Sequence, residues 1–277
     1  MSVSLIYAYW PNRPFGMTWC DLPWALREAG LPERLHQAGH EVVETTVYAE
    51  GDDGEELRGG FELARNIGRA VKEARSAYDL PVVLCGSCSV AAVGTLCGGL
   101  GGADTGVLWC DAHPDLNTPE TSTSGLFEGM ALAVAAGRAW QALSAEAGLT
   151  PVSLAHTVLF GARDIDAAEQ TVLSDKGVPV ARDAKEVNAR LSGSRQTYVH
   201  LDMDVHDALE VRTNQFAVEN GPSVSTVRDV LTGCDRLSAL AVTGLDPSAN
   251  GAKEAFDVAI DHVLAVAVAW CEGAYNA

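Results

Sequence analysis

The chain has 277 residues, 47% of them hydrophobic, which is enough apolar material for one large core. Its net charge of −18 argues against a nucleic-acid partner, because phosphate binding needs a basic surface. The N-terminus lacks the basic region of a signal peptide, and the longest apolar run, 263–270, is about half a membrane span. We therefore expect a cytoplasmic protein that does not act at a membrane.

Strand-like and helix-like segments alternate along the whole chain. Short apolar runs predict strands at 5–9, 40–48, 81–86, 105–113, 157–164, 198–205 and 237–245. Helical spacing predicts helices at 23–39, 55–78, 89–102, 127–148, 167–177, 223–234 and 253–270. This alternation is typical of a mostly parallel sheet covered by helices on both faces. No repeat or linker interrupts it, so we predict a single domain over residues 1–277.

Two of the predicted strands end in acidic clusters. One leads into Asp111, His113 and Asp115, and the other into Asp202 and Asp204. Alternate residues of an extended segment point the same way, and parallel strands end at one edge of a sheet, so these side chains can converge. Carboxylates this close repel unless cations lie between them. The pattern predicts a site for two divalent ions, and solvated acidic loops are the alternative.

These segments carry a family resemblance. WCDAHPDLNTPETSTSG resembles the metal-binding signature of the ureohydrolases, the arginase and agmatinase family, and HLDMDVHD resembles its second metal segment, S-x-D-x-D-x-x-D. LREAGLPERLHQAGHEV and FGARDIDAAE resemble further segments, in the family's order. The resemblance implies an α/β three-layer α/β/α sandwich around a mostly parallel sheet. It also implies hydrolysis of a guanidino carbon by water activated between two Mn²⁺ ions.

A third strand ends in Cys85-Gly86-Ser87-Cys88, a C-x-x-C spacing. A redox pair and half of a zinc site are two interpretations, but a zinc ribbon needs a second C-x-x-C, which the chain lacks. The family has G-G-D-H-S here, with a metal-binding His, so the resemblance places Cys88 on a metal ligand. A thiolate is soft and prefers zinc, iron or copper(I) to manganese. The remaining alternative is a small core cysteine beside a degraded metal site.

The resemblance implies two ligand sets that share the bridging carboxylates Asp111 and Asp202. The first ion would be held by Cys88, Asp111, Asp115 and Asp202. The second ion would be held by His113, Asp111, Asp202 and Asp204. Asp115 would also orient the attacking water, which makes it a candidate catalytic residue.

The resemblance further implies an amino-acid site. Asn117, Ser122 and Ser124 match positions that hold the α-carboxylate, and Asp166 and Glu169 match positions that face the α-amino group. Agmatinases, whose substrate lacks the carboxylate, do not normally carry the N-T-P and T-S-G stretch, so we expect an arginine-like α-amino acid. An ordinary Ser/Thr-rich loop is the alternative for each residue taken singly.

Two positions depart from the family pattern. Glu128 replaces a proton-shuttling His, and a Glu can also move protons or bind a cationic group. Gly244 replaces the acidic residue that clamps the guanidinium, which opens space beside the reacting carbon. Glu219 is a candidate substitute for that acid, with a solvated loop carboxylate as the alternative. We therefore predict cleavage of Nω-hydroxy-L-arginine, an arginine analogue enlarged at its guanidino end, to hydroxyurea and L-ornithine.

Other functions stay open at this point. An arginase or another guanidino acid hydrolase is the alternative within the class, and a ligand-binding protein with an impaired metal site is the alternative outside it. A deacetylase relative shares the fold type but is disfavoured by the N-T-P and R-D-x-D strings. The expected partner is a small amino acid. The chain ends just after its last predicted helix, without the tail through which some arginases trimerise, so we favour a monomer.

Overall fold

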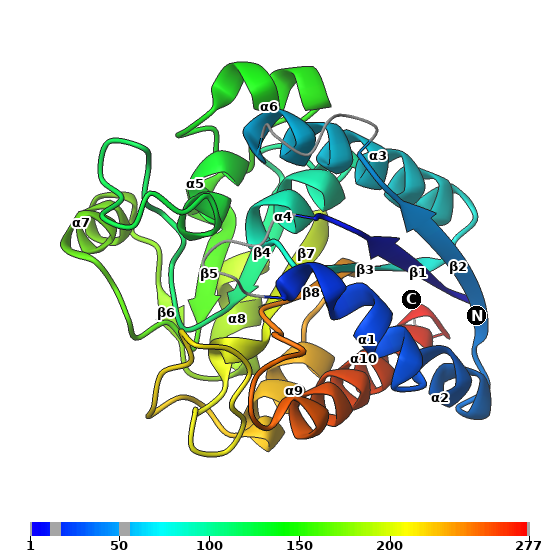
Figure 1. Ribbon diagram of the computed structural model, residues 1–277. Coiled ribbons are helices and arrows are strands. Elements are labelled where there is room, and N and C mark those ends of the chain that lie inside the picture. The colour runs from blue at the N-terminus through cyan, green and yellow to red at the C-terminus, as the bar shows by residue number, and fades with distance from the viewer. Residues whose placement is uncertain (1, 12–17, 50–55, 276–277) are drawn as a thin grey trace.

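The computed structural model describes residues 2–11, 18–49 and 56–275. In these residues eight strands form one sheet, and every hydrogen-bonded pair of strands is parallel (Figure 1). The strand order is β2-β1-β3-β8-β7-β4-β5-β6. The bounds are β1 Ser2–Ala8, β2 Glu41–Val47, β3 Leu80–Cys85, β4 Thr105–Cys110, β5 Thr157–Phe160, β6 Val180–Ala181, β7 Gln196–Asp202 and β8 Leu237–Thr243.

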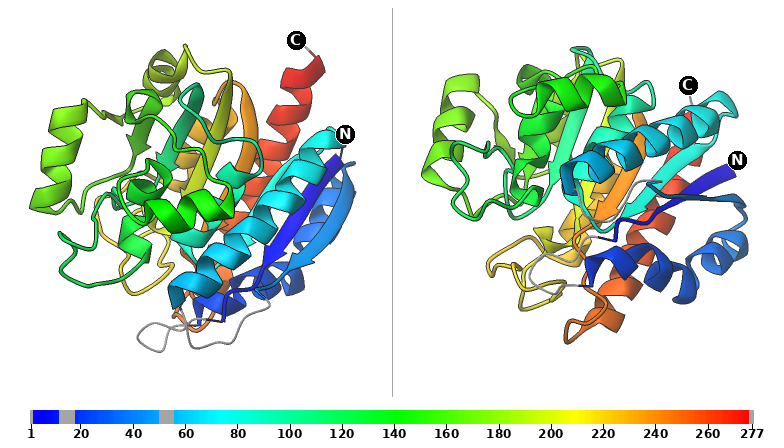
Figure 2. Two further views of the ribbon diagram at one scale, coloured as in Figure 1. Left: turned by 90° about the horizontal axis from the view of Figure 1, so that it is seen from above. Right: turned by 45° about the horizontal axis from the view of Figure 1, so that its top comes forward.

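Helices cover both faces of the sheet, so the expected three-layer α/β/α sandwich is confirmed (Figure 2). One face carries α3 Glu56–Ser76, α4 Cys88–Cys97, α5 Ala131–Ala135, α6 Gln141–Ala147 and α7 Ala167–Lys176. The other carries α1 Leu22–Glu28, α2 Leu31–Gln37, α8 Ala184–Leu191, α9 Val224–Thr232 and α10 Ala252–Tyr275. Short 3-10 turns lie at η2 Trp19–Asp21, η3 Glu128–Met130, η4 Leu154–His156 and η5 Met203–Val205.

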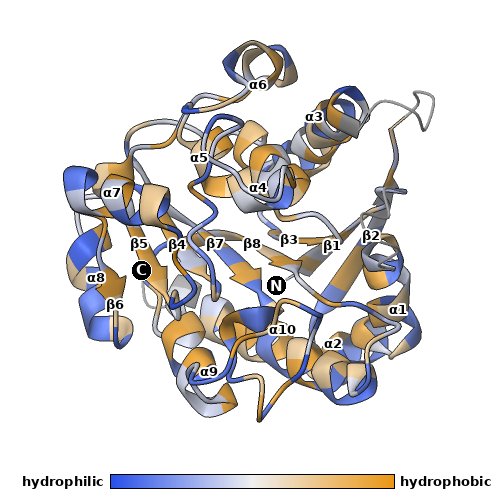
Figure 3. Ribbon diagram, turned by 60° about the vertical axis from the view of Figure 1, so that its left-hand side comes forward, coloured by the Kyte–Doolittle hydropathy of each residue, from blue (hydrophilic) through white to orange (hydrophobic). Residues whose placement is uncertain are grey.

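The core consists of two apolar layers, one on each face of the sheet. β3 and β4 are buried at every position, and the strands are mostly orange in Figure 3. α4 is almost entirely buried and packs closely on α3. The close packing depends on small residues, because a Cβ on Gly94 would lie only 2.7 Å from the Cβ of Ile67 in α3. Within the described residues, no helix combines the length and apolar character that crossing a membrane requires.

Three segments differ from the sequence-based expectation. The helix expected at 23–39 is split into α1 and α2 by Gly30, whose φ of +92° is left-handed. The helix expected at 127–148 is broken into η3, α5 and α6, with left-handed residues at Gly137 and Trp140. β6 and α8 were not predicted, because β6 is two residues long and α8 has a buried stripe of only Val187 and Leu191.

The strand order decides where the functional residues meet. β3, β8, β7 and β4 are neighbours in the middle of the sheet. Cys110 pairs with Leu201 and Asp202 pairs with Thr243, so Asp111, Asp202 and Gly244 leave the sheet at the same level. In parallel α/β sheets, ligands bind at these carboxyl ends.

Candidate metal centre and substrate pocket

A cavity of about 250 Å³ opens at the carboxyl ends of the central strands. Every residue that the sequence predicted for the site lines this cavity except Ser122 and the alternative acid Glu219. The predicted residues that line the cavity come from five separate parts of the chain. These predicted lining residues are Cys88, Asp111, His113, Asp115, Asn117, Ser124, Glu128, Asp166, Glu169, Asp202, Asp204 and Gly244.

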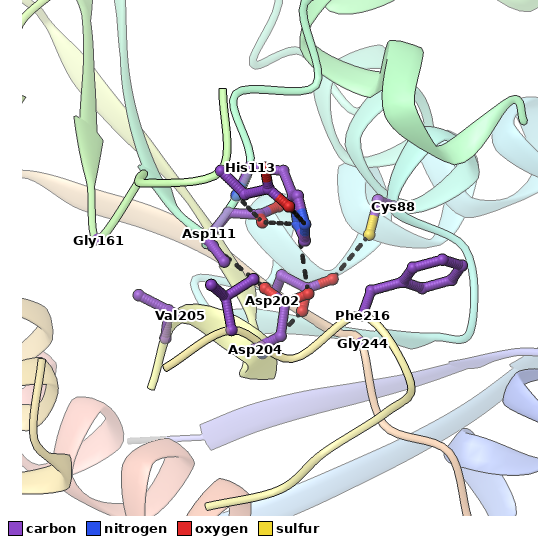
Figure 4. Close-up of polar contacts among 12 residues, drawn as sticks. Cys88, Asp111, His113, Gly161, Asp202, Asp204, Val205, Phe216 and Gly244 are labelled. Atoms are coloured by element: carbon purple, nitrogen blue, oxygen red, sulfur yellow. Dashed lines mark hydrogen bonds and ion pairs between the residues drawn. The ribbon is translucent and has the colours of Figure 1, made fainter. Parts of the chain in front are cut away.

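The floor of the cavity is a cluster of buried carboxylates around one imidazole (Figure 4). Nδ1 of His113 lies 3.2 Å from Oδ1 of Asp111 and 3.4 Å from Oδ2 of Asp204. The loops after β4 and β7 are tied together, because Asp204 Oδ1 accepts a hydrogen bond of 3.1 Å from the Ala112 N–H. Asp202 Oδ1 in turn accepts one of 2.8 Å from the Asp204 N–H.

The pKa values of these groups show how unfavourable the clustering is. Burial and the neighbouring Asp204 raise the pKa of Asp111 to about 7. Burial, with Asp204 and Asp111 nearby, also raises the pKa of Asp202 well above its usual range. Burial lowers the pKa of His113, but the carboxylates of Asp204 and Asp111 outweigh it and the net change is upward. One imidazolium does not neutralise this many carboxylates, and bound cations would.

Asp115 has an unusual backbone. Its φ is +51°, a left-handed conformation that Asp tolerates better than most residues, and its side chain is buried. Burial and the charge of Asp111 raise the pKa of Asp115. The Asp115 carbonyl accepts a hydrogen bond of 3.0 Å from the N–H of Ala133 in α5, which holds the turn. Strained residues that the surroundings hold in place often lie at functional sites.

Cys88 is the first residue of α4 and points into the same cluster. Its thiol donates to Asp202 Oδ2 at 3.0 Å, and its sulfur lies 3.3 Å from Thr243 Oγ1. Burial and the charge of Asp202 raise the pKa of the Cys88 thiol. Burial also raises the pKa of Cys85 to about 12, and both cysteines are free. Reactive redox cysteines have depressed pKa values, so the pair has the opposite character.

The donor atoms fall into two groups that can hold a metal ion. One comprises Asp111, His113 and Asp204, and the other comprises Cys88, Asp111 and His200. In each, the donor atoms lie within 4.8 Å of one another, and Asp111 belongs to both. The residues therefore fit a pair of divalent cations with a shared carboxylate, and the buried, mutually repelling carboxylates give a reason for cations to bind.

The loop after Asp115 forms one wall of the cavity. Asn117 donates to Asp166 Oδ2 at 2.9 Å and accepts from the Thr121 hydroxyl at 2.9 Å. Ser124 lines the cavity, and Ser122 lies behind it with the two hydroxyl oxygens 3.4 Å apart. Ser122 accepts a hydrogen bond of 3.0 Å from the Gly125 N–H, so the structure places it in the turn rather than on the wall.

Glu169 is more constrained than the sequence suggested. One carboxylate oxygen accepts from the Leu116 N–H at 2.9 Å, and the other accepts from the Asp166 N–H at 3.0 Å. The side chain is only 4% exposed, and burial raises its pKa. Glu169 therefore fastens the start of α7 to the loop that follows the acidic cluster. Asp166, the residue before α7, is exposed, and its Oδ2 accepts the hydrogen bond from Asn117.

Glu128 lines the cavity beside the first turn of α4. Its Oε2 accepts a hydrogen bond of 2.9 Å from the Ser87 hydroxyl and one of 3.3 Å from the Ser89 N–H. The N-terminus of a helix carries partial positive charge, which favours a carboxylate there. Glu128 is thus held at one edge of the cavity at a fixed distance from the acidic floor.

Two expectations at the guanidino end need correction. Gly244 does not leave free room at its own position: its φ is +73°, and a Cβ there would lie 1.8 Å from Asp202 Oδ1. The Asp202 carboxylate occupies that space. Glu219 is exposed and is not among the residues that line the cavity, so it matches the solvated-loop alternative.

Other lining residues carried no clear signal in the sequence. Trp19 and Phe216 pack edge to face with ring centroids 5.9 Å apart and form an aromatic wall. Asn214 joins this wall to the floor, since it donates to the Gly244 carbonyl at 2.8 Å and accepts from the Phe216 N–H at 2.7 Å. These residues come from loops outside the acidic motifs, where no periodic pattern marks them.

The fold and the site together define a candidate two-cation hydrolytic centre at the carboxyl edge of a parallel sheet. Comparison with known proteins identifies the class: the Arginase family model matches residues 22–268, so the chain belongs to the arginase family.

Individual relatives agree with this assignment. An arginase from Bacillus caldovelox is 32% identical over 66% of this chain and 68% of its own length. An N(omega)-hydroxy-L-arginine amidinohydrolase from Streptomyces lavendulae is 29% identical over 84% of this chain and 86% of its own. The crystal structure of arginase from Bacillus cereus superimposes with a TM-score of 0.87 at 24% identity, over 96% of this chain and 98% of that one.

Proposed function

We propose that this chain is a binuclear manganese amidinohydrolase that cleaves Nω-hydroxy-L-arginine to hydroxyurea and L-ornithine. The observation that carries the proposal is the cavity itself. Its floor holds two overlapping groups of metal-ligand atoms, and its guanidino end has Gly244, Asn214 and Phe216 where an acidic clamp would be needed for guanidinium. The relative from Streptomyces lavendulae named for hydroxyarginine supports the same substrate.

The proposed ligands are those of the acidic floor. Cys88, Asp111, Asp115 and Asp202 would hold one ion, and His113, Asp111, Asp202 and Asp204 the other. When bound, the two cations would lower the pKa of a water so that it can attack the guanidino carbon near neutral pH. The Asp115 carboxylate would accept a hydrogen bond from the attacking water and orient it. The strained backbone at Asp115 supports that fixed position.

The amino-acid head would bind at the loop wall. Asn117 and Ser124 would hold the α-carboxylate, with Ser122 supporting Ser124 through the turn. Asp166 would face the α-amino group. We assign Glu169 an indirect part, because its two oxygens already accept backbone N–H groups.

The reacting end would lie between the acidic floor and the aromatic wall. Hydroxyguanidine is less basic than guanidine, so it depends less on an acidic partner and suits a wall made of a glycine, an amide and two aromatic rings. Water adds to the guanidino carbon, the bond to the ornithine nitrogen breaks, and that nitrogen gains a proton. Glu128 is the proposed relay for this proton, because its carboxylate is held at the cavity edge by Ser87 and Ser89.

A second candidate is an arginase or another guanidino acid hydrolase that releases urea. Many of the relatives are named arginase, which favours this candidate. The two substrates differ by one oxygen, and the cavity floor would serve either.

A paired assay separates the candidates. Manganese-loaded protein is given L-arginine or Nω-hydroxy-L-arginine, and ornithine, urea and hydroxyurea are measured. Ornithine and hydroxyurea from hydroxyarginine alone support the proposal, whereas efficient release of urea from arginine contradicts it. Bound metal without any turnover would indicate a different guanidino acid, and failure to bind metal would indicate a ligand-binding protein.

The relay role of Glu128 has its own test. Glu128→Gln should lower kcat for hydroxyarginine by about 10²-fold, because a positioned acid–base group contributes at least that much. Glu120→Gln is the matched control, since Glu120 is exposed in the neighbouring loop and should leave kcat unchanged. An unchanged kcat in Glu128→Gln would exclude the relay.

A further inference from the structure

His200 lies beside the candidate metal centre and has no part in the function proposed above. It is on β7, paired with Trp109 of β4 and Ala241 of β8. The ring is fully buried and stacks on that of Trp109, with centroids 3.7 Å apart and an interplanar angle of 10°. Alternation along the strand puts its side chain on the same face as that of Asp202, the face that α4 covers.

The two ring nitrogens of His200 have different neighbours. Nδ1 forms a hydrogen bond of 3.0 Å with the Tyr198 hydroxyl. Nε2 has a longer contact of 3.4 Å with Thr243 Oγ1, and that oxygen lies 3.3 Å from the Cys88 sulfur. Nε2 is therefore the nitrogen on the side of Cys88.

Three donor atoms of different kinds meet at this point. A sulfur of Cys88, a carboxylate oxygen of Asp111 and a ring nitrogen of His200 all lie within 4.8 Å of one another. A zinc-like cation bonds nitrogen and oxygen at about 2.0–2.2 Å and sulfur at about 2.3 Å in a tetrahedral arrangement, so two of its ligand atoms lie roughly 3.6 Å apart and the group has to contract by about 1 Å. Small side-chain shifts close the group around one ion.

The sequence shows why an imidazole is available here. Cys88 stands where the G-G-D-H-S pattern has His, and His200 stands where S-x-D-x-D-x-x-D has Ser. The imidazole that α4 lacks at its first residue is thus present on the neighbouring strand. Compared with the family patterns, this edge of the sheet therefore has a sulfur donor in addition to a nitrogen donor.

We propose that His200 Nε2 binds a divalent cation together with the Cys88 thiolate and the Asp111 carboxylate, and that this donor set makes the position prefer zinc or cobalt(II) to manganese. The inference rests on the proposed function for the existence of the metal centre; it adds a ligand, and it replaces manganese with zinc or cobalt(II) at this one of the two positions. Sulfur and nitrogen donors suit zinc and cobalt, whereas manganese prefers oxygen. The thiol proton leaves to solvent as the cation binds.

Tyr198 has a positioning role in this arrangement. When Nδ1–H donates to the Tyr198 oxygen, the lone pair stays on Nε2 and points toward Cys88. Metal-binding histidines generally have such a partner on the other nitrogen, which fixes the tautomer and the ring orientation. The stacking on Trp109 holds the ring plane in the same way.

Metal binding without turnover tests the inference. Metal-free protein is titrated with zinc or manganese against a competing chelator, and with cobalt(II) to follow the thiolate-to-cobalt absorption band. His200→Gln should weaken zinc binding at one of the two positions by about tenfold or more, the scale on which even supporting groups matter. His40→Gln is the matched control, because His40 is also a buried histidine but lies outside both ligand groups.

A second variant reverses the exchange of donors. The double variant Cys88→His/His200→Ser places the imidazole back on α4, and its ratio of zinc to manganese affinity should fall by about tenfold or more. A direct readout is NMR of the wild-type protein loaded with spin-active cadmium and nitrogen-labelled histidine. A scalar coupling between cadmium and His200 Nε2 is expected, and it should vanish in His200→Gln.

The outcomes separate the two proposals. Zinc affinity that is unchanged in a folded His200→Gln, or no cadmium coupling at His200, overturns the ligand role and leaves His200 as a core residue. Equal zinc-to-manganese ratios in the wild type and the double variant overturn the metal preference. Neither result affects the proposed reaction, which is judged by the products formed from hydroxyarginine.

Discussion

Arg163 holds the loops of the candidate metal centre together, and replacing it should loosen them. Its guanidinium donates six hydrogen bonds to backbone carbonyls, of Gly161, Asp204, Val205, His206, Val218 and Glu219, at 2.7–3.1 Å. These carbonyls belong to the ends of β5 and β7 and to the loop before α9. Burial lowers the pKa of Arg163, but nearby carboxylates such as Asp204 favour its charged form.

Arg163→Met keeps much of the side-chain volume and removes all six hydrogen bonds, which the five N–H groups of the guanidinium make. Because the side chain is partly exposed, water replaces some of them, so we take about 0.5 kcal/mol for each bond, the low end of the usual range. The expected loss in the free energy of unfolding is therefore about 3 kcal/mol. Arg163→Lys keeps the charge but has three donors on one nitrogen, so it should recover at most half of the loss.

Urea unfolding of the metal-free variants measures this loss, and manganese titration measures the effect on Asp204. Arg182→Met is the control, since Arg182 is exposed and pairs with Glu186 at the surface, and it should change neither quantity. A loss below about 1 kcal/mol in Arg163→Met, or equal losses for Met and Lys, would refute the reasoning.

Three further predictions concern single side chains. Gly244→Ala should lower the free energy of unfolding by about 1–3 kcal/mol and weaken metal binding, because the new Cβ would collide with Asp202. Gly39 is also left-handed but has open space around it, so Gly39→Ala should lower the free energy of unfolding by only about 1 kcal/mol. Equal losses in the two variants would contradict this explanation. Glu169→Gln should lower the free energy of unfolding by about 1–2 kcal/mol, measured with urea, because the amide nitrogen of Gln would face a backbone N–H. An unchanged free energy of unfolding would argue against a role of Glu169 in fastening α7 to the loop after the acidic cluster. Burial and His206 lower the pKa of His262 to about 3, so this buried neutral ring stabilises the fold above about pH 6.5 and loses its contribution as the pH falls. The stability difference between wild type and His262→Asn should therefore shrink by about 2 kcal/mol from about pH 7.5 to about pH 5, and a constant difference would exclude the effect.

Much of the architecture follows from local patterns in the chain. Buried strands such as β3 and β4 appear as short apolar runs, and α3 and α9 appear as amphipathic helices, because burial on one or two faces imposes a period on the sequence. Breaks inside helical patterns were harder to predict. Gly30 and Gly137 look compatible with a helix until tertiary packing selects their left-handed conformation.

Some residues of the candidate site could likewise be predicted from the sequence, and others could not. The acidic motifs mark Asp111, His113 and Asp204 by their spacing, because alternate residues at a strand end must face the same side. No spacing marks His200, because one histidine in an apolar strand looks like any core residue. It becomes visible only through its distance from Cys88 and Asp111.

What the sequence determined by itself is therefore the set of elements and the chemistry at three strand ends. Tertiary structure decided which of those ends are neighbours. β8 and β7 lie between β3 and β4, although they come last in the chain, and this order brings Cys88, Gly244, Asp202 and Asp111 to one edge. The physical reason is that strand order depends on how helices and strands far apart in sequence bury each other, a property of the whole core that no local segment encodes.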